Sequence, residues 1–298
     1  MIPVIEVGGT HVTAALVDLA SGRIAHRTDL PLDPDGSAGE ILRAVRACAD
    51  AVDAPAGACW GVAVPGPFDY AKGIALFADV GKFASLYGTD VRADLFGGLR
   101  RCPADVVFLN DAHAFLIGEW SAGAVRGHTR AVGITLGTGV GSAFLAEGRI
   151  LDQGPGIPPE GRMDLTRLGG APLEETVSRR AILARFGDPA ADVRDIAERA
   201  RAGQRRARHV LDEAFGALGR VLGPRLAAFG ASAVVVGGSM ARSWDLVAPA
   251  LNAGLADGGW PVPDQTGGEG RHTRAMRPAG LAGDAALVGV ARAVAARE

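Results

Sequence analysis

Apolar runs of strand length alternate with amphipathic segments of helical length along most of this chain. The predicted strands are residues 2–7, 12–17, 59–64, 106–109, 131–136, 142–150 with a turn at Glu147-Gly148, and 233–236. The predicted helices are residues 37–52, 89–99, 111–123, 172–186, 193–202, 205–229 with a kink or break at Gly223-Pro224, 244–255 and 280–296. Residues 257–270 are rich in glycine and predict a loop. Strands and helices that alternate in this way are typical of an α/β protein.

Glycine turns follow three of the predicted strands; the third, Gly237-Gly238, precedes a predicted helix, and the first two lead into another strand. Gly8-Gly9-Thr10 separates the first two strands, and residues 137–141 place three glycines within five positions. Glycines leave backbone N–H groups unshielded, as a phosphate requires. The residues after 141 predict a strand, whereas a dinucleotide fingerprint needs a helix there, and the chain contains no Gly-Lys-Ser/Thr of a Walker A loop. The first two turns are therefore predicted to lie in β-hairpins.

Two carboxylates lie at positions that indicate a functional role. Asn110-Asp111 follows strand 106–109 and precedes a helix, and α/β sheets place their active sites at such strand ends. Asp111 could instead only cap that helix. Glu6 lies on an apolar strand, where an unpaired carboxylate is costly, so a functional role is favoured.

Composition narrows the function classes. The 298 residues suit one large domain or two ordinary ones, and a net charge of −2 gives no case for binding nucleic acid or an acidic membrane. No apolar run reaches the roughly 20 residues of a membrane span. The first strand begins at Ile2 or Pro3, so we expect no signal peptide. Cys48, Cys59 and Cys102 have no metal-like spacing, so we expect reduced thiols, no zinc and a cytoplasmic protein.

Several segments, in order, resemble the actin/hexokinase-like ATPases and, within them, the ROK (repressor, open reading frame, kinase) sugar kinases. They read EVGGTHVTAALVD, GVAVPGPFD, LNDAHAFLIGEW, GITLGTGVGSAFLAEGRIL and VVVGGS. The resemblance implies a two-lobed, ribonuclease H-like α/β fold with a nucleotide and sugar cleft between the lobes. Since each glycine hairpin begins a lobe, we expect a small N-terminal lobe of residues 1–115 plus 281–298 and a large C-terminal lobe of residues 116–280.

The resemblance also implies a function: ATP- and Mg²⁺-dependent phosphorylation of a hydroxyl of a hexose or amino-hexose by a glucokinase-like homodimer. Asp111 would take the hydroxyl proton and Asn110 would orient the sugar, with Gly66 and Glu160 as further sugar contacts. The residues implied to hold the nucleotide are Gly8, Gly9, Thr10, Gly137, Thr138 and Gly139 at the phosphates and Gly237 and Gly238 beside adenosine.

Three departures from the family pattern bear on this expectation. Glu6 replaces the usual Asp near the Mg²⁺ position, and Glu160-Gly161-Arg162 stands where Glu-x-Gly-His is usual, so the His is missing. No cysteine follows Cys102, so we expect the family's zinc loop to be absent. The chain starts directly with the first strand, so we expect no helix-turn-helix of the repressor branch. Two alternatives stay open: a catalytically silent sugar- or nucleotide-binding protein on the same fold, and a kinase that uses polyphosphate as donor.

Overall fold

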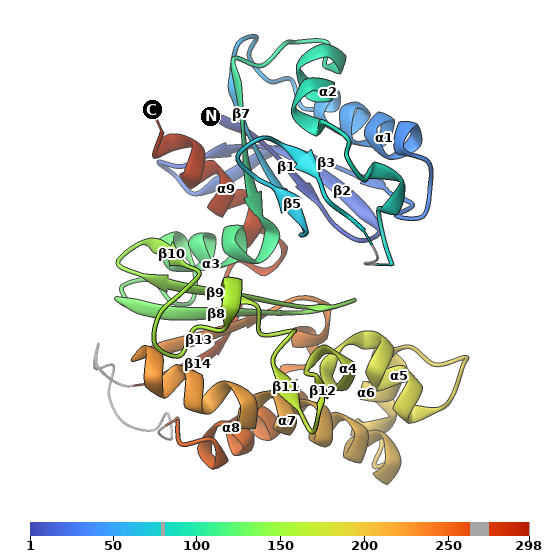
Figure 1. Ribbon diagram of the computed structural model, residues 1–298, viewed down its shortest axis with the longest axis vertical. Coiled ribbons are helices and arrows are strands. Elements are labelled where there is room, and N and C mark those ends of the chain that lie inside the picture. Colours follow the sequence, from blue (N-terminus) through green and yellow to red (C-terminus); the bar gives the residue numbers. More distant parts are fainter. Residues whose placement is uncertain (79–80, 263–273, 298) are drawn as a thin grey trace. The chain divides into compact units, whose positions relative to one another are not determined.

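A computed structural model describes residues 1–78, 81–262 and 274–297 of the chain (Figure 1). Residues 263–270 of the predicted loop lie outside this part. The contacts between residues divide the chain into two compact units. The first is Met1–Ala122 with Gly283–Glu298, and the second is Gly123–Ala282. Each unit contains one five-stranded sheet and its own helices. The predicted α/β class is confirmed.

The sheet of the first unit has the strand order β3-β2-β1-β4-β7. Strands β1, β2 and β3 are antiparallel neighbours, whereas β4 is parallel to β1 and β7 is parallel to β4. Their bounds are β1 Ile2–Val7, β2 His11–Asp18, β3 Arg23–Pro31, β4 Cys59–Val64 and β7 Asp105–Asn110; a two-stranded sheet pairs β5 Phe68–Asp69 with β6 Ile74–Ala75.

Helices cover both faces of this sheet (Figure 1). Helix α1 (Ala38–Ala51) begins with a capping box, in which the N–H of Ser37 donates to Glu40 at 2.9 Å. Neighbouring residues of a strand point to opposite faces of the sheet. Ile5 of β1 points into the core under α1. Gly61 of β4 faces the other side, where a Cβ on it would meet Val290 of α9. Helices α9 (Ala285–Ala295) and α3 (Asp111–Ala122) pack together there; η1 (Ala84–Leu86) and α2 (Val91–Gly98) complete the unit.

The second unit repeats this strand pattern. Its order is β10-β9-β8-β13-β14, with antiparallel pairs at β10–β9 and β9–β8 and parallel pairs at β8–β13 and β13–β14. The predicted strand after Gly141 and the hairpin reading of the glycine turn are therefore confirmed. The bounds are β8 Arg130–Leu136, β9 Val140–Ala146, β10 Arg149–Leu151, β13 Ala233–Gly237 and β14 Ala275–Pro278; β11 Arg167–Leu168 pairs separately with β12 Ala171–Pro172.

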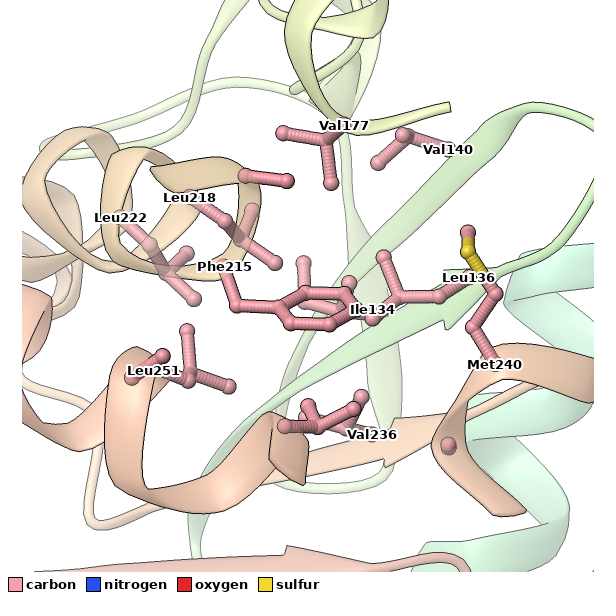
Figure 2. Packing of buried hydrophobic residues seen from close by; sticks show 14 of the residues in the cluster. Ile134, Leu136, Val140, Val177, Phe215, Leu218, Leu222, Val236, Met240 and Leu251 are labelled. Carbon is pink, nitrogen blue, oxygen red and sulfur yellow. The ribbon is translucent and has the colours of Figure 1, made fainter. Parts of the chain in front are cut away.

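The core of the second unit forms between its sheet and α7 (Arg205–Phe229) with α8 (Trp244–Asp257). Phe215 and Leu218 of α7 point toward Ile134 of β8 (Figure 2). Helix α7 is continuous across Gly223-Pro224, so of the predicted kink or break the break is absent. The predicted helix 172–186 is two short helices, α4 (Glu174–Val177) and α5 (Arg179–Phe186), because Ser178 is extended and its side chain caps α5. The remaining elements are η2 Pro159–Gly161, α6 Val193–Arg201, η3 Ser239–Ser243 and η4 Ala282–Asp284.

Two longer strands escaped the sequence pattern. β3 carries mostly exposed, polar side chains at the edge of its sheet, and β14 has only two buried residues. Neither shows the apolar run from which a strand is predicted. Over the ranges that the structure describes, none of the helices is both long enough and apolar enough to cross a membrane.

Candidate functional site

The chemistry predicted for the first unit lies where β7 ends and α3 begins. The Oδ1 atom of Asn110 accepts hydrogen bonds from the N–H groups of Ala112 at 3.0 Å and His113 at 3.3 Å. Asn110 therefore caps α3. One carboxylate oxygen of Asp111 also accepts from Ala112 at 2.9 Å, while its other oxygen, Oδ2, accepts no hydrogen bond from any described residue. The helix is capped without that oxygen, which leaves Oδ2 available to a ligand.

Burial changes the acidity of Asp111. The side chain is half-buried, and desolvation raises its pKa above the usual 3.8, with the positive charge of Lys82 acting in the opposite direction. A carboxylate with a raised pKa is a better proton acceptor than an exposed one.

Glu6 lies on the neighbouring strand β1, and its pKa is raised to about 7. Burial is the main cause, and the negative charge of Asp111 is the second. Arg27 lowers this pKa from β3, where its guanidinium binds Asp29 at 2.9 Å and Asp284 at 2.5 Å. The two carboxylates, Glu6 and Asp111, thus interact electrostatically within one unit.

These two carboxylates fit the way proteins bind Mg²⁺. Among the described residues, no group of three or more His, Cys, Asp or Glu side chains is arranged to hold a metal ion. Mg²⁺ does not need such a cage, because it usually keeps several waters and binds one or two carboxylates together with substrate phosphates. A divalent cation beside Glu6 and Asp111 would favour the ionised form of both.

The turn Gly8-Gly9-Thr10 joins β1 to β2 in the same unit. Gly8 donates from its N–H to the carbonyl of His11 at 2.8 Å, and a Cβ on Gly8 would lie 3.2 Å from that oxygen. The N–H groups of Gly9 and Thr10 donate to no other residue in the described part of the chain. Two unbonded N–H groups in a tight turn can bind an anion such as a phosphate.

The sugar-contact candidates fall in both units. Gly66 lies beside the end of β7, since a Cβ there would be 3.8 Å from Nδ2 of Asn110 and 3.2 Å from the hydroxyl of Tyr70. Tyr70 was not predicted from the sequence, because only the folded loop after β4 brings it to Asn110. Glu160 belongs to the second unit, where it is exposed and has a left-handed φ of 57°. Arg162, which replaces the expected His, pairs with Asp164 at 2.7 Å.

The glycine turn of the second unit follows β8 and has unbonded N–H groups as well. Gly137 donates to the carbonyl of Gly139 at 3.0 Å, and the carbonyl of Gly137 accepts from the N–H of Arg179 at 3.2 Å. The N–H groups of Thr138 and Gly139 donate to no other described residue. The buried side chains of Leu136 and Val140 anchor the two ends of the turn in the core (Figure 2).

The turn at Gly237-Gly238 lies beside that glycine turn. β13 runs parallel to β8, with Gly237 opposite Thr135, so both turns leave the same edge of the sheet. Gly238 has a φ of 86°, and a Cβ on it would overlap the carbonyl of Leu136. Only glycine fits there.

A pocket of about 620 Å³ opens beside this second turn. Most of its lining is charged, and it consists of Arg179, Asp192, Val193, Arg194, Glu198, Arg201, Ser239, Met240, Arg242 and Ser243. Arg179 pairs with Asp192 at 3.0 Å and Arg194 pairs with Glu198 at 3.2 Å. Its volume is within the range of sites that hold small ligands and cofactors.

A known protein family matches nearly the whole chain. The model of the ROK family matches residues 3–289. The chain belongs to the ROK family. This ROK chain is 27% identical over 281 residues to a glucokinase of Thermotoga maritima, a match that covers 85% of the chain and 86% of the relative. The resemblance inferred from the motifs is confirmed.

Solved ROK structures share the fold. A ROK family glucokinase from Streptomyces griseus, in complex with glucose and AMPPNP, has a TM-score of 0.77 at 24% identity and 98% coverage of both chains. An inorganic polyphosphate/ATP-glucomannokinase from Arthrobacter has a TM-score of 0.70 at 26% identity and 100% coverage of both chains. The predicted actin-like ATPase fold is confirmed.

Proposed function

We propose that this ROK protein is a carbohydrate kinase that transfers the γ-phosphoryl group of ATP to a hydroxyl of a hexose or amino-hexose. The observation that carries this proposal is the junction of β7 and α3, where Asn110 caps the helix and leaves an oxygen of Asp111 available. The named relatives include a glucokinase and an ATP-using glucomannokinase, which agrees with a hexose as substrate.

Asp111 would act as the general base. A sugar hydroxyl attacks phosphorus readily only when its proton has an acceptor, and Asp111 Oδ2 is available for that proton. As the oxygen–phosphorus bond forms, the hydroxyl proton moves to Asp111 and the bond from the γ-phosphorus to ADP breaks. Phosphoryl transfer depends mainly on positioning and on charge neutralisation, so one well-placed carboxylate suffices.

Glu6 would bind Mg²⁺, through water, together with the nucleotide. The cation supplies charge neutralisation at the phosphates when it is bound. Burial is the main cause that raises the pKa of Glu6 to about 7, and the negative charge of Asp111 is the second. A cation would relieve this repulsion, which supports the assignment.

The nucleotide contacts proposed for the second unit rest on the two adjacent turns. The unbonded N–H groups of Thr138 and Gly139 would bind phosphate oxygens, and the pocket beside Gly237-Gly238 would take the nucleoside. In the first unit, Gly8, Gly9 and Thr10 would contribute further phosphate contacts, and Gly66 would lie beside the sugar. Glu160 is kept as a sugar contact on the resemblance alone.

Polyphosphate is a second candidate donor. Four arginines and two acidic residues, Asp192 and Glu198, line the pocket, so the lining carries net positive charge. Arg201 pairs with Asp245 outside the lining at 2.7 Å. Exposed ion pairs of this kind are weak and can exchange for a polyanion. A silent binding protein is disfavoured, because Asn110-Asp111 is retained and Oδ2 of Asp111 accepts no hydrogen bond from any described residue.

A coupled assay with a panel of hexoses and amino-hexoses, with either ATP or polyphosphate and Mg²⁺, tests the proposal. We expect turnover with ATP on at least one sugar and its loss in Asp111→Asn. Sugar binding without turnover by the wild-type protein, with either donor, would favour the silent alternative. The homodimer and the cytoplasmic location stay predictions, and light scattering at micromolar concentration tests the former.

A further inference from the structure

We propose that Tyr70 is a positioning residue for the sugar, because its hydroxyl holds the Asn110 amide so that Asn110 meets the substrate only as a hydrogen-bond donor. This inference rests on the proposed sugar kinase activity. It concerns the first unit alone, and it adds a residue that the family motifs do not include.

The helix decides which way the amide of Asn110 points. Two backbone N–H groups, those of Ala112 and His113, point at the side chain. Only the amide oxygen can accept from them, so Oδ1 faces the helix and the NH₂ group faces away from it. The acceptor of this amide is thereby used up within the protein.

Tyr70 fixes the NH₂ group in turn. Nδ2 of Asn110 donates to the Tyr70 hydroxyl at 3.0 Å, and that hydroxyl lies 3.4 Å from the carbonyl oxygen of Val64, to which it donates. The ring of Tyr70 packs on Phe68, with centroids 5.4 Å apart. Gly66 leaves the space that this contact needs, because a Cβ there would lie 3.2 Å from the hydroxyl.

The second hydrogen of Nδ2 has no acceptor among the described residues, so it is available to a ligand. Asp111, the next residue, presents a carboxylate that can only accept. Asn110 and Asp111 would therefore bind two hydroxyls of one sugar. The first hydroxyl accepts a hydrogen bond from Asn110, and the second donates to Asp111 and is phosphorylated. A sugar that lacks the first hydroxyl leaves an N–H unbonded and should bind more weakly.

The test combines Tyr70→Phe with monodeoxy analogues of the best sugar substrate. Loss of one neutral hydrogen bond predicts a sugar KM that rises roughly three- to tenfold, while kcat changes by less than about twofold. In the wild-type enzyme, one deoxy analogue should show a raised KM, and in Tyr70→Phe the KM ratio between that analogue and the parent sugar should shrink toward one. The matched control is Tyr87→Phe, since Tyr87 is the chain's other tyrosine and is 62% exposed.

The outcomes separate this inference from the function on which it rests. An unchanged sugar KM in Tyr70→Phe overturns the inference, as does a KM that rises equally for the parent sugar and every deoxy analogue. If Tyr70→Phe lowers Tm markedly, Gly66→Ala is the second variant, because its Cβ would press on the Tyr70 hydroxyl. In this variant too, the KM ratio between the deoxy analogue and the parent sugar should shrink toward one. A ratio that stays at the wild-type value counts against the inference. A wild-type protein with no kinase activity on any sugar instead rejects the proposed function.

Discussion

Gly118 of α3 lies directly against the main-chain carbonyl of Ala285 at the start of α9, and a Cβ on Gly118 would overlap that oxygen. The contact is reciprocal, because a Cβ on Gly289 of α9 would overlap the carbonyl of Ala114 in α3. The backbones of the two helices thus touch although about 170 residues separate them along the chain. Since α3 begins with Asp111, this contact fixes the helix that carries the proposed base.

Gly118→Ala should therefore destabilise the protein by about 1–3 kcal/mol, the usual cost of overpacking. Helix propensity alone predicts the opposite sign, because alanine is favoured over glycine in helices by about 1 kcal/mol. Gly39→Ala is the control, since Gly39 is exposed in α1 and a Cβ there meets nothing within 4 Å. Urea unfolding of both variants measures the effect, and a Gly118→Ala protein as stable as wild type would show that the helices can separate at little cost.

Asp111→Asn should lower kcat by about 10²- to 10⁴-fold, the usual contribution of a general base, with a small change in sugar KM. The substitution keeps the shape of the side chain and a hydrogen-bond acceptor for Ala112. Asp90→Asn is the matched control, because Asp90 caps α2 through the N–H of Ala93 at 2.8 Å and has no proposed catalytic role. Equal loss of activity in both variants, or loss of stability without a kcat defect in Asp111→Asn, would favour the capping role.

The pKa of Glu6 predicts how stability depends on pH. The folded protein holds the Glu6 proton up to about pH 7, whereas the unfolded chain releases it near pH 4.5. Between these values the folded state binds more protons than the unfolded chain, so the free energy of unfolding falls as pH rises. The slope is roughly 1.4 kcal/mol per pH unit, which gives a total loss of about 3 kcal/mol. Below pH 4.5 this penalty is absent, and above pH 7 it is complete.

Glu6→Gln should remove this dependence. The variant should match wild type near pH 4.5 and exceed it in stability at pH 8, as measured by urea unfolding at each pH. Glu175→Gln, at an exposed position in α4, is the control and should follow wild type throughout. A Glu6→Gln protein that is less stable than wild type at pH 8 would mean that the carboxylate makes a stabilising contact.

The sequence predicted most of this fold where the pattern reports burial directly. The apolar runs around Ile5 and Val234 become central strands, and Ser37 with Glu40 marks the start of α1. The sequence pattern did not predict β3, because this polar segment is a strand only through its pairing at the edge of the sheet. In the same way, the motif identified Asn110, whereas Tyr70 is brought to it by tertiary folding and has no signature in sequence spacing.

Gly139 and Gly238 belong to adjacent glycine turns, but their replacement by alanine should have different consequences. A Cβ on Gly139 would meet only the carboxylate tip of Glu174, the flexible end of a side chain, and φ at 139 is not positive. Gly139→Ala should thus fold with little loss of stability. The added methyl would stand beside N–H groups that we assign to phosphate, so we expect the KM for ATP to rise on the order of tenfold, which corresponds to about 1.4 kcal/mol.

A Cβ on Gly238 would instead overlap the backbone carbonyl of Leu136, and its φ of 86° is strained for alanine. Gly238→Ala should therefore lower Tm and the yield of folded protein before any effect on ATP can be isolated. Thermal unfolding together with ATP kinetics on the two variants separates the roles. A Gly139→Ala protein with an unchanged KM for ATP would remove this turn from the phosphate site, and a fully stable Gly238→Ala protein would show that the ends of β8 and β13 can move apart.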